Sequence, residues 1–245
     1  MKAVVDKLNI FKNLISIFGS LVEDATFIFS PDGMTVTGMD ISHCSMTQIQ
    51  LSKDFFSEYV VKETVNVSIH LQNFILVLKT VSGGVIELTN KREELLTIRS
   101  KSKAGTVGEI HIKLMDIESD ELTPDKIDYL ITKEFNSSDF KQFVETVVAF
   151  GDEIHFEITN NYMSVMAEGD IGKKIETMEL DGMEIDGLSS FKNKFSASYI
   201  TRFLTATKVS KQVTLMLGEE KPLSMTYKFD GGFINFFLAP KIDDF

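Results

Sequence analysis

Apolar residues recur at helical spacing in four segments of the chain. In residues 9–22 they fall three and four positions apart, which is the pattern of a helix with one buried side. The same spacing occurs within 70–82, 139–150 and 198–211, so we predict four amphipathic helices. Their apolar positions are Ile10, Phe11, Leu14, Ile15, Phe18, Leu21 and Val22; Leu71, Phe74, Ile75 and Leu78; Phe140, Phe143, Val144 and Val147; and Tyr199, Ile200, Phe203 and Leu204.

Segments between the predicted helices alternate apolar and polar residues, which is typical of strands with one buried face. The alternation is clearest in residues 65–69, 110–114 and 154–158. Ser82-Gly83-Gly84 and Asp230-Gly231-Gly232 each separate two apolar runs, and we predict hairpin turns at both. Short helices among many antiparallel strands indicate the α+β class.

The two halves of the chain resemble each other at an offset of 129 residues. The matched pairs include Phe11 with Phe140, Lys12 with Lys141, Phe27 with Phe156, Phe74 with Phe203 and Lys79 with Lys208. One ungapped offset aligns both helices and the strands between them, so we predict a tandem duplication. We expect domains at 1–115 and 129–245, joined by an exposed connecting loop at 116–128 that holds six acids and one proline.

Composition limits the class of protein. A chain of 245 residues with 43% apolar and 25% charged residues can bury a full core, which excludes global disorder. The single cysteine, Cys44, excludes an intramolecular disulfide and indicates a reducing compartment. No apolar run approaches the roughly 18 residues of a membrane span. The first ten residues do not resemble a secretory signal, so we expect an intracellular protein.

The net charge of −11 argues, as a single number, against a nucleic-acid-binding protein. Its distribution argues otherwise, because the four helical segments carry +4 and the rest of the chain −15. The cations of these segments are Lys12, Lys79, Lys141, Arg202, Lys208 and Lys211, and the acids are Asp139 and Glu145. A basic helix side in an acidic protein suits a polyanion contacted through its phosphates. The alternative is that these are ordinary solvated lysines.

Nothing in the sequence resembles a catalytic constellation. Residues 169–174 hold two glycines and two lysines, but their spacing is not that of a phosphate-binding loop. His43 and Cys44 are neighbours and supply at most one metal ligand, and no second His/Cys cluster occurs in the sequence. We therefore expect no metal, no cofactor and no enzymatic activity.

Three short motifs resemble the proliferating cell nuclear antigen (PCNA) family of DNA sliding clamps. Residues 38–46 (GMDISHCSM) resemble its MD-x-SH-[VC]-S segment, and residues 112–116 (IKLMD) the KLMD run that opens its interdomain connecting loop. Residues 238–244 (LAPKIDD) are similar to its C-terminal LAPKI followed by acids. The motifs occur in the family's order and span essentially the whole chain.

The resemblance implies a DNA-clamp fold of two tandem domains and a head-to-tail homotrimer that encircles duplex DNA. Helices would line the hole and antiparallel sheets the outer face, and strands near 108–114 and 172–180 would join the subunits. The function implied is that of a processivity factor for a DNA polymerase. The six helix cations become candidates for phosphate contact, although Asn13, Gly19, Leu76 and Glu145 stand where the family often has Lys or Arg.

The resemblance also implies a hydrophobic pocket beneath the connecting loop. Short motifs of polymerases, ligases, nucleases and the clamp loader would dock there during DNA replication and repair. The matching positions are Met39, His43, Cys44, Met46, Leu122, Pro222, Phe237, Leu238, Ala239 and Pro240. Without the resemblance, these residues would be interpreted as core.

Two other functions stay open at this stage. In the first alternative, the chain is one subunit of a heteromeric checkpoint or damage-signalling clamp. In the second, it is a two-domain intracellular enzyme with an unrecognised site. A clamp would act in the nucleus of a eukaryote, or otherwise at the cytoplasmic site of DNA replication.

Overall fold

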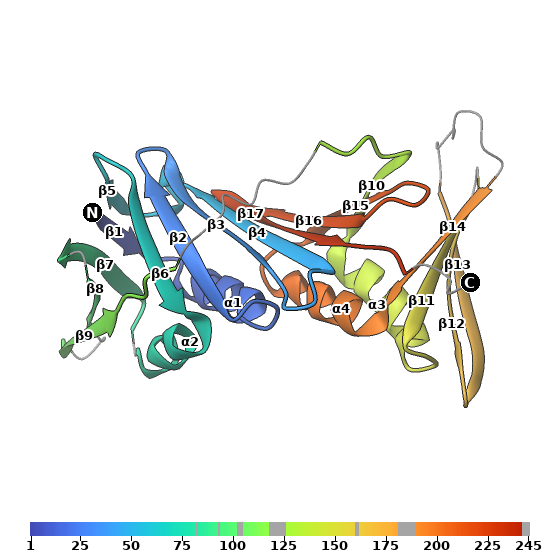
Figure 1. Cartoon of the computed structure of the whole chain (residues 1–245), viewed down its shortest axis with the longest axis horizontal. Coiled ribbons are helices and arrows are strands. Elements are labelled where there is room, and N and C mark those ends of the chain that lie inside the picture. Colours follow the sequence, from blue (N-terminus) through green and yellow to red (C-terminus); the bar gives the residue numbers. More distant parts are fainter. Residues whose placement is uncertain are drawn as a thin grey trace. The chain divides into compact units, whose positions relative to one another are not determined.

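The chain divides into two compact units (Figure 1). The computed structural model describes residues 1–81, 83–92, 94–101, 105–117, 126–159, 162–180 and 190–241. The N-terminal unit comprises Met1–Pro124 with Lys228–Ile234, and the C-terminal unit comprises Asp125–Tyr227 with Asn235–Phe245. Each unit combines two α-helices with antiparallel strands, so the predicted α+β class is confirmed.

The N-terminal unit places its strands in the orders β5-β1-β7-β8-β9 and β4-β3-β2-β6. Its elements, in chain order, are β1 (Lys2–Val5), α1 (Leu8–Phe18), β2 (Asp24–Ser30), β3 (Gly33–Met39), β4 (Ser45–Ser52), the 3₁₀-helix η1 (Lys53–Phe55), β5 (Glu58–Val60), β6 (Val65–His70), α2 (Leu71–Thr80), β7 (Val85–Arg92), β8 (Leu95–Lys101) and β9 (Val107–Lys113).

The C-terminal unit repeats this arrangement, with strand orders β10-β15-β16-β17 and β13-β12-β11-β14. Its elements are β10 (Ile131–Asn136), α3 (Ser137–Val148), β11 (Glu153–Thr159), β12 (Tyr162–Gly169), β13 (Gly172–Glu179), β14 (Ser190–Ser196), α4 (Ala197–Leu204), the 3₁₀-helix η2 (Thr205–Lys208), β15 (Gln212–Leu217), β16 (Leu223–Phe229) and β17 (Gly232–Leu238). The common element order supports the predicted tandem duplication. The exact domain boundaries stay a prediction.

The offset of 129 residues holds for the first half of each unit. It relates α1 to α3, where Phe11 and Phe140 are both buried. It also relates β2 to β11, whose bounds differ by exactly that number. Lys12 and Lys141 therefore occupy equivalent positions in the two units.

The predicted offset of 129 residues is wrong for the second helix of each unit, because the observed offset there is 126 residues. Asp24 pairs with His70, whereas Glu153 pairs with Ser196, so the second unit has three fewer residues between these strands. The buried residues agree, because Leu71, Phe74 and Leu78 of α2 correspond at this offset to Ala197, Ile200 and Leu204 of α4. The predicted pairing of Phe74 with Phe203 and of Lys79 with Lys208 is therefore wrong.

Two local predictions also differ from the structure. The first helix ends at Phe18 instead of residue 22, and a Cβ on the following Gly19 would lie 2.7 Å from Ile75 Cδ1. Glycine therefore allows α1 to approach α2 closely, and the chain turns away there. The segment 82–84 is no hairpin, because its described residues Gly83 and Gly84 connect α2 to β7. The hairpin predicted at Asp230-Gly231-Gly232 is confirmed between β16 and β17.

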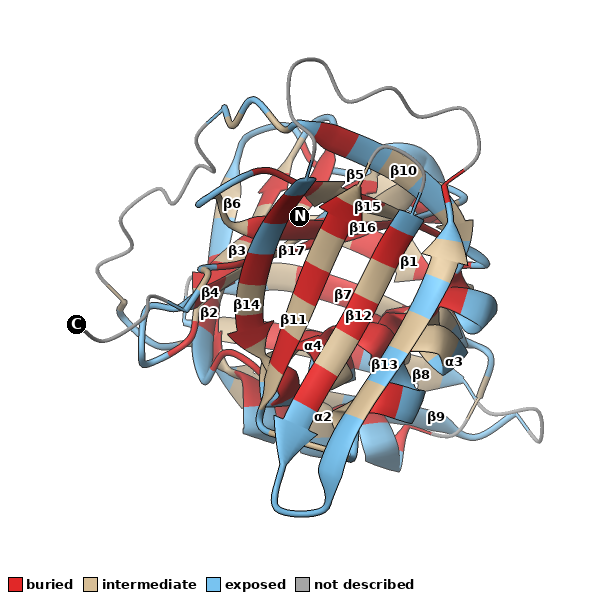
Figure 2. Cartoon of the chain, turned by 90° about the vertical axis from the view of Figure 1, so that its right-hand side faces the viewer, coloured by how far each residue is buried: buried red, intermediate tan, exposed pale blue. Residues whose placement is uncertain are grey.

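The core of each unit lies where the apolar sides of the helices meet the alternating faces of the strands. Figure 2 shows buried residues alternating with more exposed ones along β11, β12 and β14. In the N-terminal unit the Phe74 ring of α2 makes edge contacts with Phe11 of α1 and Phe27 of β2. In the C-terminal unit Phe203 of α4 stacks on Phe236 of β17, with ring centroids 4.5 Å apart.

Two tyrosines, the half-buried Tyr59 and the fully buried Tyr227, test the energetic role of hydrogen bonding. The hydroxyl of Tyr59 donates to the carbonyls of Ser30 and Gly33, at 2.8 and 2.7 Å, and burial raises the pKa of Tyr59 to about 12. The fully buried Tyr227 hydroxyl has no hydrogen-bond partner among the described residues. A buried hydroxyl without a partner costs stability, whereas a bonded one contributes to it.

We expect Tyr227→Phe to raise the free energy of unfolding by about 1 kcal/mol, because it removes an unbonded buried hydroxyl. Tyr59→Phe is the matched variant and should lower it by about 1 kcal/mol. Urea unfolding of both variants measures the difference. A loss of stability in Tyr227→Phe would show that its hydroxyl is bonded.

Candidate functional site

The two equivalent lysines on the first helix of each unit have different partners. The Nζ of Lys12 donates a hydrogen bond of 3.0 Å to the carbonyl of Val81, the residue that follows the last turn of α2. The C-terminal end of a helix carries partial negative charge, which favours an ammonium group there. Lys12 thus links α1 to α2 through a neutral acceptor.

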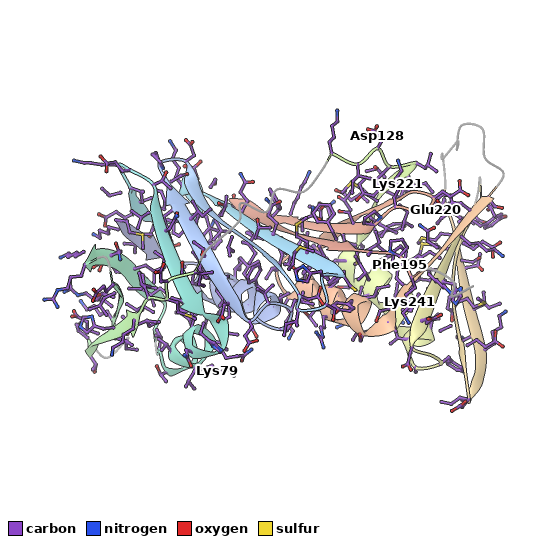
Figure 3. The ribbon with its side chains drawn as sticks, in the orientation of Figure 1. Lys79, Asp128, Phe195, Glu220, Lys221 and Lys241 are labelled. Atoms are coloured by element: carbon purple, nitrogen blue, oxygen red, sulfur yellow. The ribbon has the colours of Figure 1, made fainter. Side chains whose placement is uncertain are left out.

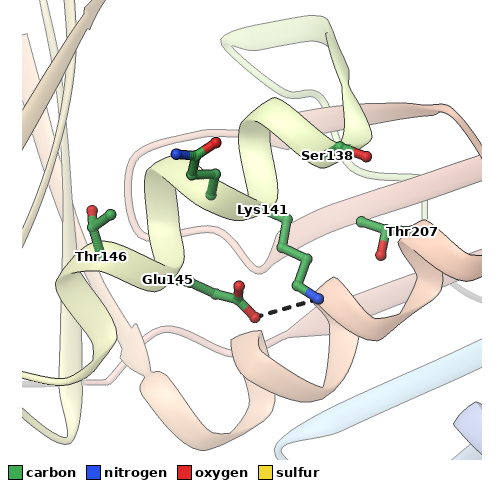
Figure 4. Close-up of a pocket in the computed structure, with 6 residues that line it drawn as sticks. Ser138, Lys141, Glu145, Thr146 and Thr207 are labelled. Atoms are coloured by element: carbon green, nitrogen blue, oxygen red, sulfur yellow. Dashed lines mark ion pairs between the residues drawn. The ribbon is translucent and has the colours of Figure 1, made fainter.

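Lys141 of α3 instead has a carboxylate beside it. Its Nζ lies 3.5 Å from Oε1 of Glu145, one helical turn further along the same helix. The pair lies in an open groove of about 450 Å³, whose other lining residues are Ser138, Gln142 and Thr146 of α3 and Thr207 of η2 (Figure 4). Sequence reasoning did not single out these four polar residues.

The remaining helix cations are exposed at the ends of the second helices. Lys79 extends into solvent from the last turn of α2 (Figure 3), and Lys208 closes η2. Arg202 of α4 lies over the Tyr199 ring, with its guanidinium carbon 5.7 Å from the ring centroid. Lys211 is exposed between η2 and β15. Among the described residues, no ion pair is recorded for Lys79, Lys208 or Lys211.

The hairpin of β3 and β4 holds four of the predicted partner-binding residues in the N-terminal unit. Met39 and Met46 face each other across the strand pair, and both are partly exposed. His43 and Cys44 lie in the loop and are exposed, and His43 has a positive φ of 55°. The adjacent Ile41 is 83% exposed.

Asp40 fixes the conformation of this loop. Its side chain is buried and accepts hydrogen bonds from the backbone N–H groups of Ser42, at 3.0 Å, and Ser45, at 2.6 Å. Two backbone bonds, from Asp40 N to Ser45 O and from His43 N to Asp40 O, close the turn. The sequence pattern Asp-x-Ser is a known turn former, so this role was detectable from the sequence but was not predicted.

The C-terminal unit holds the other described partner-binding candidates. Pro222 is partly exposed and follows a turn that Asn193 braces, because its Nδ2 donates to the carbonyl of Gly218 at 2.7 Å. Lys221 (Figure 3) donates to the carbonyl of Asp128 at 2.7 Å. These contacts hold the β15–β16 turn against neighbouring parts of the same unit.

The last described residues of the chain are attached to the same unit. Phe237 is partly exposed, whereas Leu238 is 1% exposed and so contributes to the core. Ala239 is exposed, and Pro240, partly exposed, precedes Lys241. The backbone of Lys241 donates to the carbonyl of Lys194, and its Nζ lies 2.7 Å from Glu153 Oε1. That hydrogen bond lowers the pKa of Glu153.

The structure therefore gathers the predicted partner-binding residues into two sets, one in each unit. Leu122 and most of the predicted connecting loop lie outside the described residues. Within the described ranges, no three His, Cys, Asp or Glu side chains are grouped to hold a metal ion. None of the described helices has the length and apolar character needed to cross a bilayer.

Comparisons with known proteins identify the family. The family models "Proliferating cell nuclear antigen, N-terminal domain" and "Proliferating cell nuclear antigen, C-terminal domain" match residues 1–122 and 123–242. The chain is 26% identical to the probable DNA polymerase sliding clamp 2 of Paramecium bursaria Chlorella virus 1, across 98% of this chain and 90% of that protein. It is 27% identical to the DNA polymerase sliding clamp of Methanothermobacter thermautotrophicus, across 99% of this chain and 98% of that protein.

The fold agrees with a solved structure. The crystal structure of proliferating cellular nuclear antigen from Entamoeba histolytica superimposes with a TM-score of 0.88 at 22% identity, over 98% of both chains. Together with the repeated units, this defines a two-domain clamp fold. The chain belongs to the PCNA family of DNA sliding clamps. Members of this family are non-enzymatic processivity factors of DNA polymerases, so DNA and a polymerase are the partners that the family implies.

The role of Asp40 in the β3–β4 loop is testable. Asp40→Ala should leave the N–H groups of Ser42 and Ser45 without their acceptor, and we expect a loss of about 1–3 kcal/mol in unfolding free energy. Amide exchange at Ser42 and Ser45 should accelerate in the same variant. The control is Asp54→Ala, which removes an exposed carboxylate of η1 and should change neither quantity. Unchanged exchange in Asp40→Ala would assign the loop conformation to other contacts.

Proposed function

We propose that this chain forms a homotrimeric ring around duplex DNA and tethers a DNA polymerase to its template. The observation that carries the proposal is the placement of positive charge on the outward sides of the helices in a chain of net charge −11. Lys12, Lys79, Lys141, Arg202, Lys208 and Lys211 are the residues we assign to phosphate contact. Contact through phosphates is independent of base sequence, which suits a protein that moves along DNA.

Two strand edges that have no partner among the described residues support closure of the ring. β9 is the last strand of β5-β1-β7-β8-β9, and β13 is the first of β13-β12-β11-β14. An exposed edge favours pairing with another strand, and head-to-tail pairing of β9 with β13 of the next subunit leaves neither edge open. Exposed apolar side chains occur at both edges, among them Val107 of β9 and Ile175 of β13.

We assign the docking of partners to the two sets of residues found in the units. The N-terminal set is Met39, His43, Cys44 and Met46, and the C-terminal set is Pro222, Phe237, Leu238, Ala239 and Pro240, with Leu122 from the connecting loop. The partly exposed Met39, Met46 and Phe237 offer apolar surface to the short motifs of polymerases, ligases, nucleases and the clamp loader. If the source is eukaryotic, the clamp acts in the nucleus, where eukaryotic members of the family generally act.

The oligomeric state tests the ring. Light scattering of the purified chain should give three times the mass of one chain. Ile175→Glu, which places a charge on the exposed β13 edge, should shift the protein toward the monomer. Ile41→Glu is the matched control, because Ile41 is also exposed but lies in the β3–β4 loop. A parent chain that is monomeric and assembles only with unlike chains would favour the heteromeric clamp.

Reversing the charge of Lys79 and Lys208 tests the DNA-facing side. Lys79→Glu together with Lys208→Glu should weaken duplex binding and lower polymerase stimulation, most strongly at low salt, while the trimer persists. The matched control is the double reversal Lys62→Glu with Lys192→Glu, which changes the charge equally outside the helices. Equal loss in both double variants would indicate an effect of net charge alone, and no loss would move the phosphate contacts elsewhere.

A further inference from the structure

The first helices of the two units have the same position in the fold but opposite charge. In α1, Lys12 is the only charged residue, so the helix carries +1. In α3, Asp139 and Glu145 outnumber Lys141, so the helix carries −1. The two lysines are equivalent at the offset of 129 residues, so the difference lies in what surrounds each of them.

Glu145 corresponds at this offset to Ser16 of α1. Ser16 is exposed and lies one turn after Lys12, exactly as Glu145 lies one turn after Lys141. The ammonium of Lys12 is bonded to a neutral carbonyl, whereas that of Lys141 lies 3.5 Å from a carboxylate. A neutral carbonyl leaves the site of Lys12 with a net charge of +1, whereas the carboxylate of Glu145 brings the net charge of the Lys141 pair to zero.

The groove around the Lys141–Glu145 pair otherwise offers neutral hydrogen-bonding groups. Ser138 contributes a hydroxyl group and Gln142 an amide from α3, and Thr207 faces them from η2 (Figure 4). Thr146 also lines the groove, but its hydroxyl donates to the carbonyl of Phe143 at 2.9 Å. Hydroxyl and amide groups of this kind commonly donate to the phosphate oxygens of nucleic acids. Glu145 is therefore the one lining residue of this groove that repels a phosphate.

From this we propose that Glu145 attenuates the contact of the C-terminal unit with the DNA backbone, making the groove between α3 and η2 a weakened phosphate subsite. The proposal rests on the proposed function, since it takes the outward side of α3 to face DNA. Without Glu145, the Lys141 ammonium and the neutral groups of the groove contact a phosphate as Lys12 does from α1. With Glu145, this face holds the duplex less tightly than the equivalent face of the N-terminal unit.

The attenuation acts through charge and not by immobilising Lys141. The side chains of Lys141 and Glu145 are 33% and 45% exposed, and exposed pairs of this kind are weak and readily exchanged. A carboxylate one turn away nevertheless lies well inside the screening length, which is about 8 Å at physiological ionic strength. It therefore lowers the attraction that a phosphate in the groove experiences even when the ion pair is open.

Reciprocal substitutions test the proposal on the whole chain. Glu145→Ser gives α3 the residue that α1 has, and Ser16→Glu gives α1 the residue that α3 has. Binding of a short linear duplex is measured by fluorescence anisotropy between about 50 and 200 mM salt. Each added phosphate contact makes the slope of log affinity against log salt concentration more negative by about 0.9. Between these two salt concentrations, one contact therefore changes the affinity by about threefold.

We expect Glu145→Ser to bind duplex more tightly at low salt with a steeper salt dependence, and Ser16→Glu to show the opposite changes. The control is Glu157→Ser, because Glu157 also pairs with a lysine, Lys192, at 3.1 Å. It projects from β11 on the face opposite the buried Phe156 and Ile158. This variant has the same charge change as Glu145→Ser and should leave the salt dependence unaltered.

Two outcomes overturn the proposal and are distinguishable. If the parent chain binds duplex but Glu145→Ser matches it or matches Glu157→Ser, the attenuation by Glu145 is refuted while the clamp function stands. If neither the parent nor any variant binds duplex, the proposed DNA contact itself fails, and the inference fails with it. Light scattering of each variant verifies that the oligomeric state is the same in every comparison.

Discussion

The structure depends on helices that are apolar on one side only. In each unit the buried side of both helices packs against the alternating strands, as Phe11 and Phe74 do around Phe27. Burial of such aromatic side chains supplies much of the driving force for folding. Because the apolar side is committed to the core, the opposite side must face outward, and that outward side is where the cations lie.

The buried side of each helix stabilises the fold, whereas the outward side is the one to which we assign the function. Lys12 contributes to the fold, since its bond to the Val81 carbonyl joins the two helices, and it also belongs to the set that we assign to phosphate contact. Lys79 and Lys208 stand at the ends of their elements, exposed and without a recorded ion pair in the described parts of the chain. In a chain of net charge −11, this placement supports our assignment of both lysines to phosphate contact.

Duplication has produced two units whose first helices differ in charge on the side that faces solvent. Phe140 preserves the core role of Phe11, and Lys141 keeps the position of Lys12, but Glu145 replaces Ser16. Core positions such as Phe74 and its equivalent Ile200 stay apolar because both are buried, although the size of the side chain changes. Outward positions carry no such constraint, and the two copies are free to differ in their contribution to DNA contact.

Much of this was accessible from the sequence. Periodicity located all four helices, because one-sided burial leaves a direct imprint on residue spacing, and the resemblance of residues 38–46 and 238–244 identified the family. The change of the offset from 129 to 126 residues was missed. The second unit has three fewer residues between β11 and β14, and the identity between the two halves of the chain is too low to reveal such a gap. The role of 82–84 was also missed, since glycines connect a helix to a strand as readily as they form a hairpin.

By itself the sequence determined the α+β class, the tandem repeat and the charge of the helices, because each depends on residue types at regular spacing. Only the tertiary structure decided which groups those charges meet. That Lys12 reaches a carbonyl 69 residues away follows from distances set by packing. Residue spacing records which side of a helix is buried, but not which neighbour a polar side chain reaches.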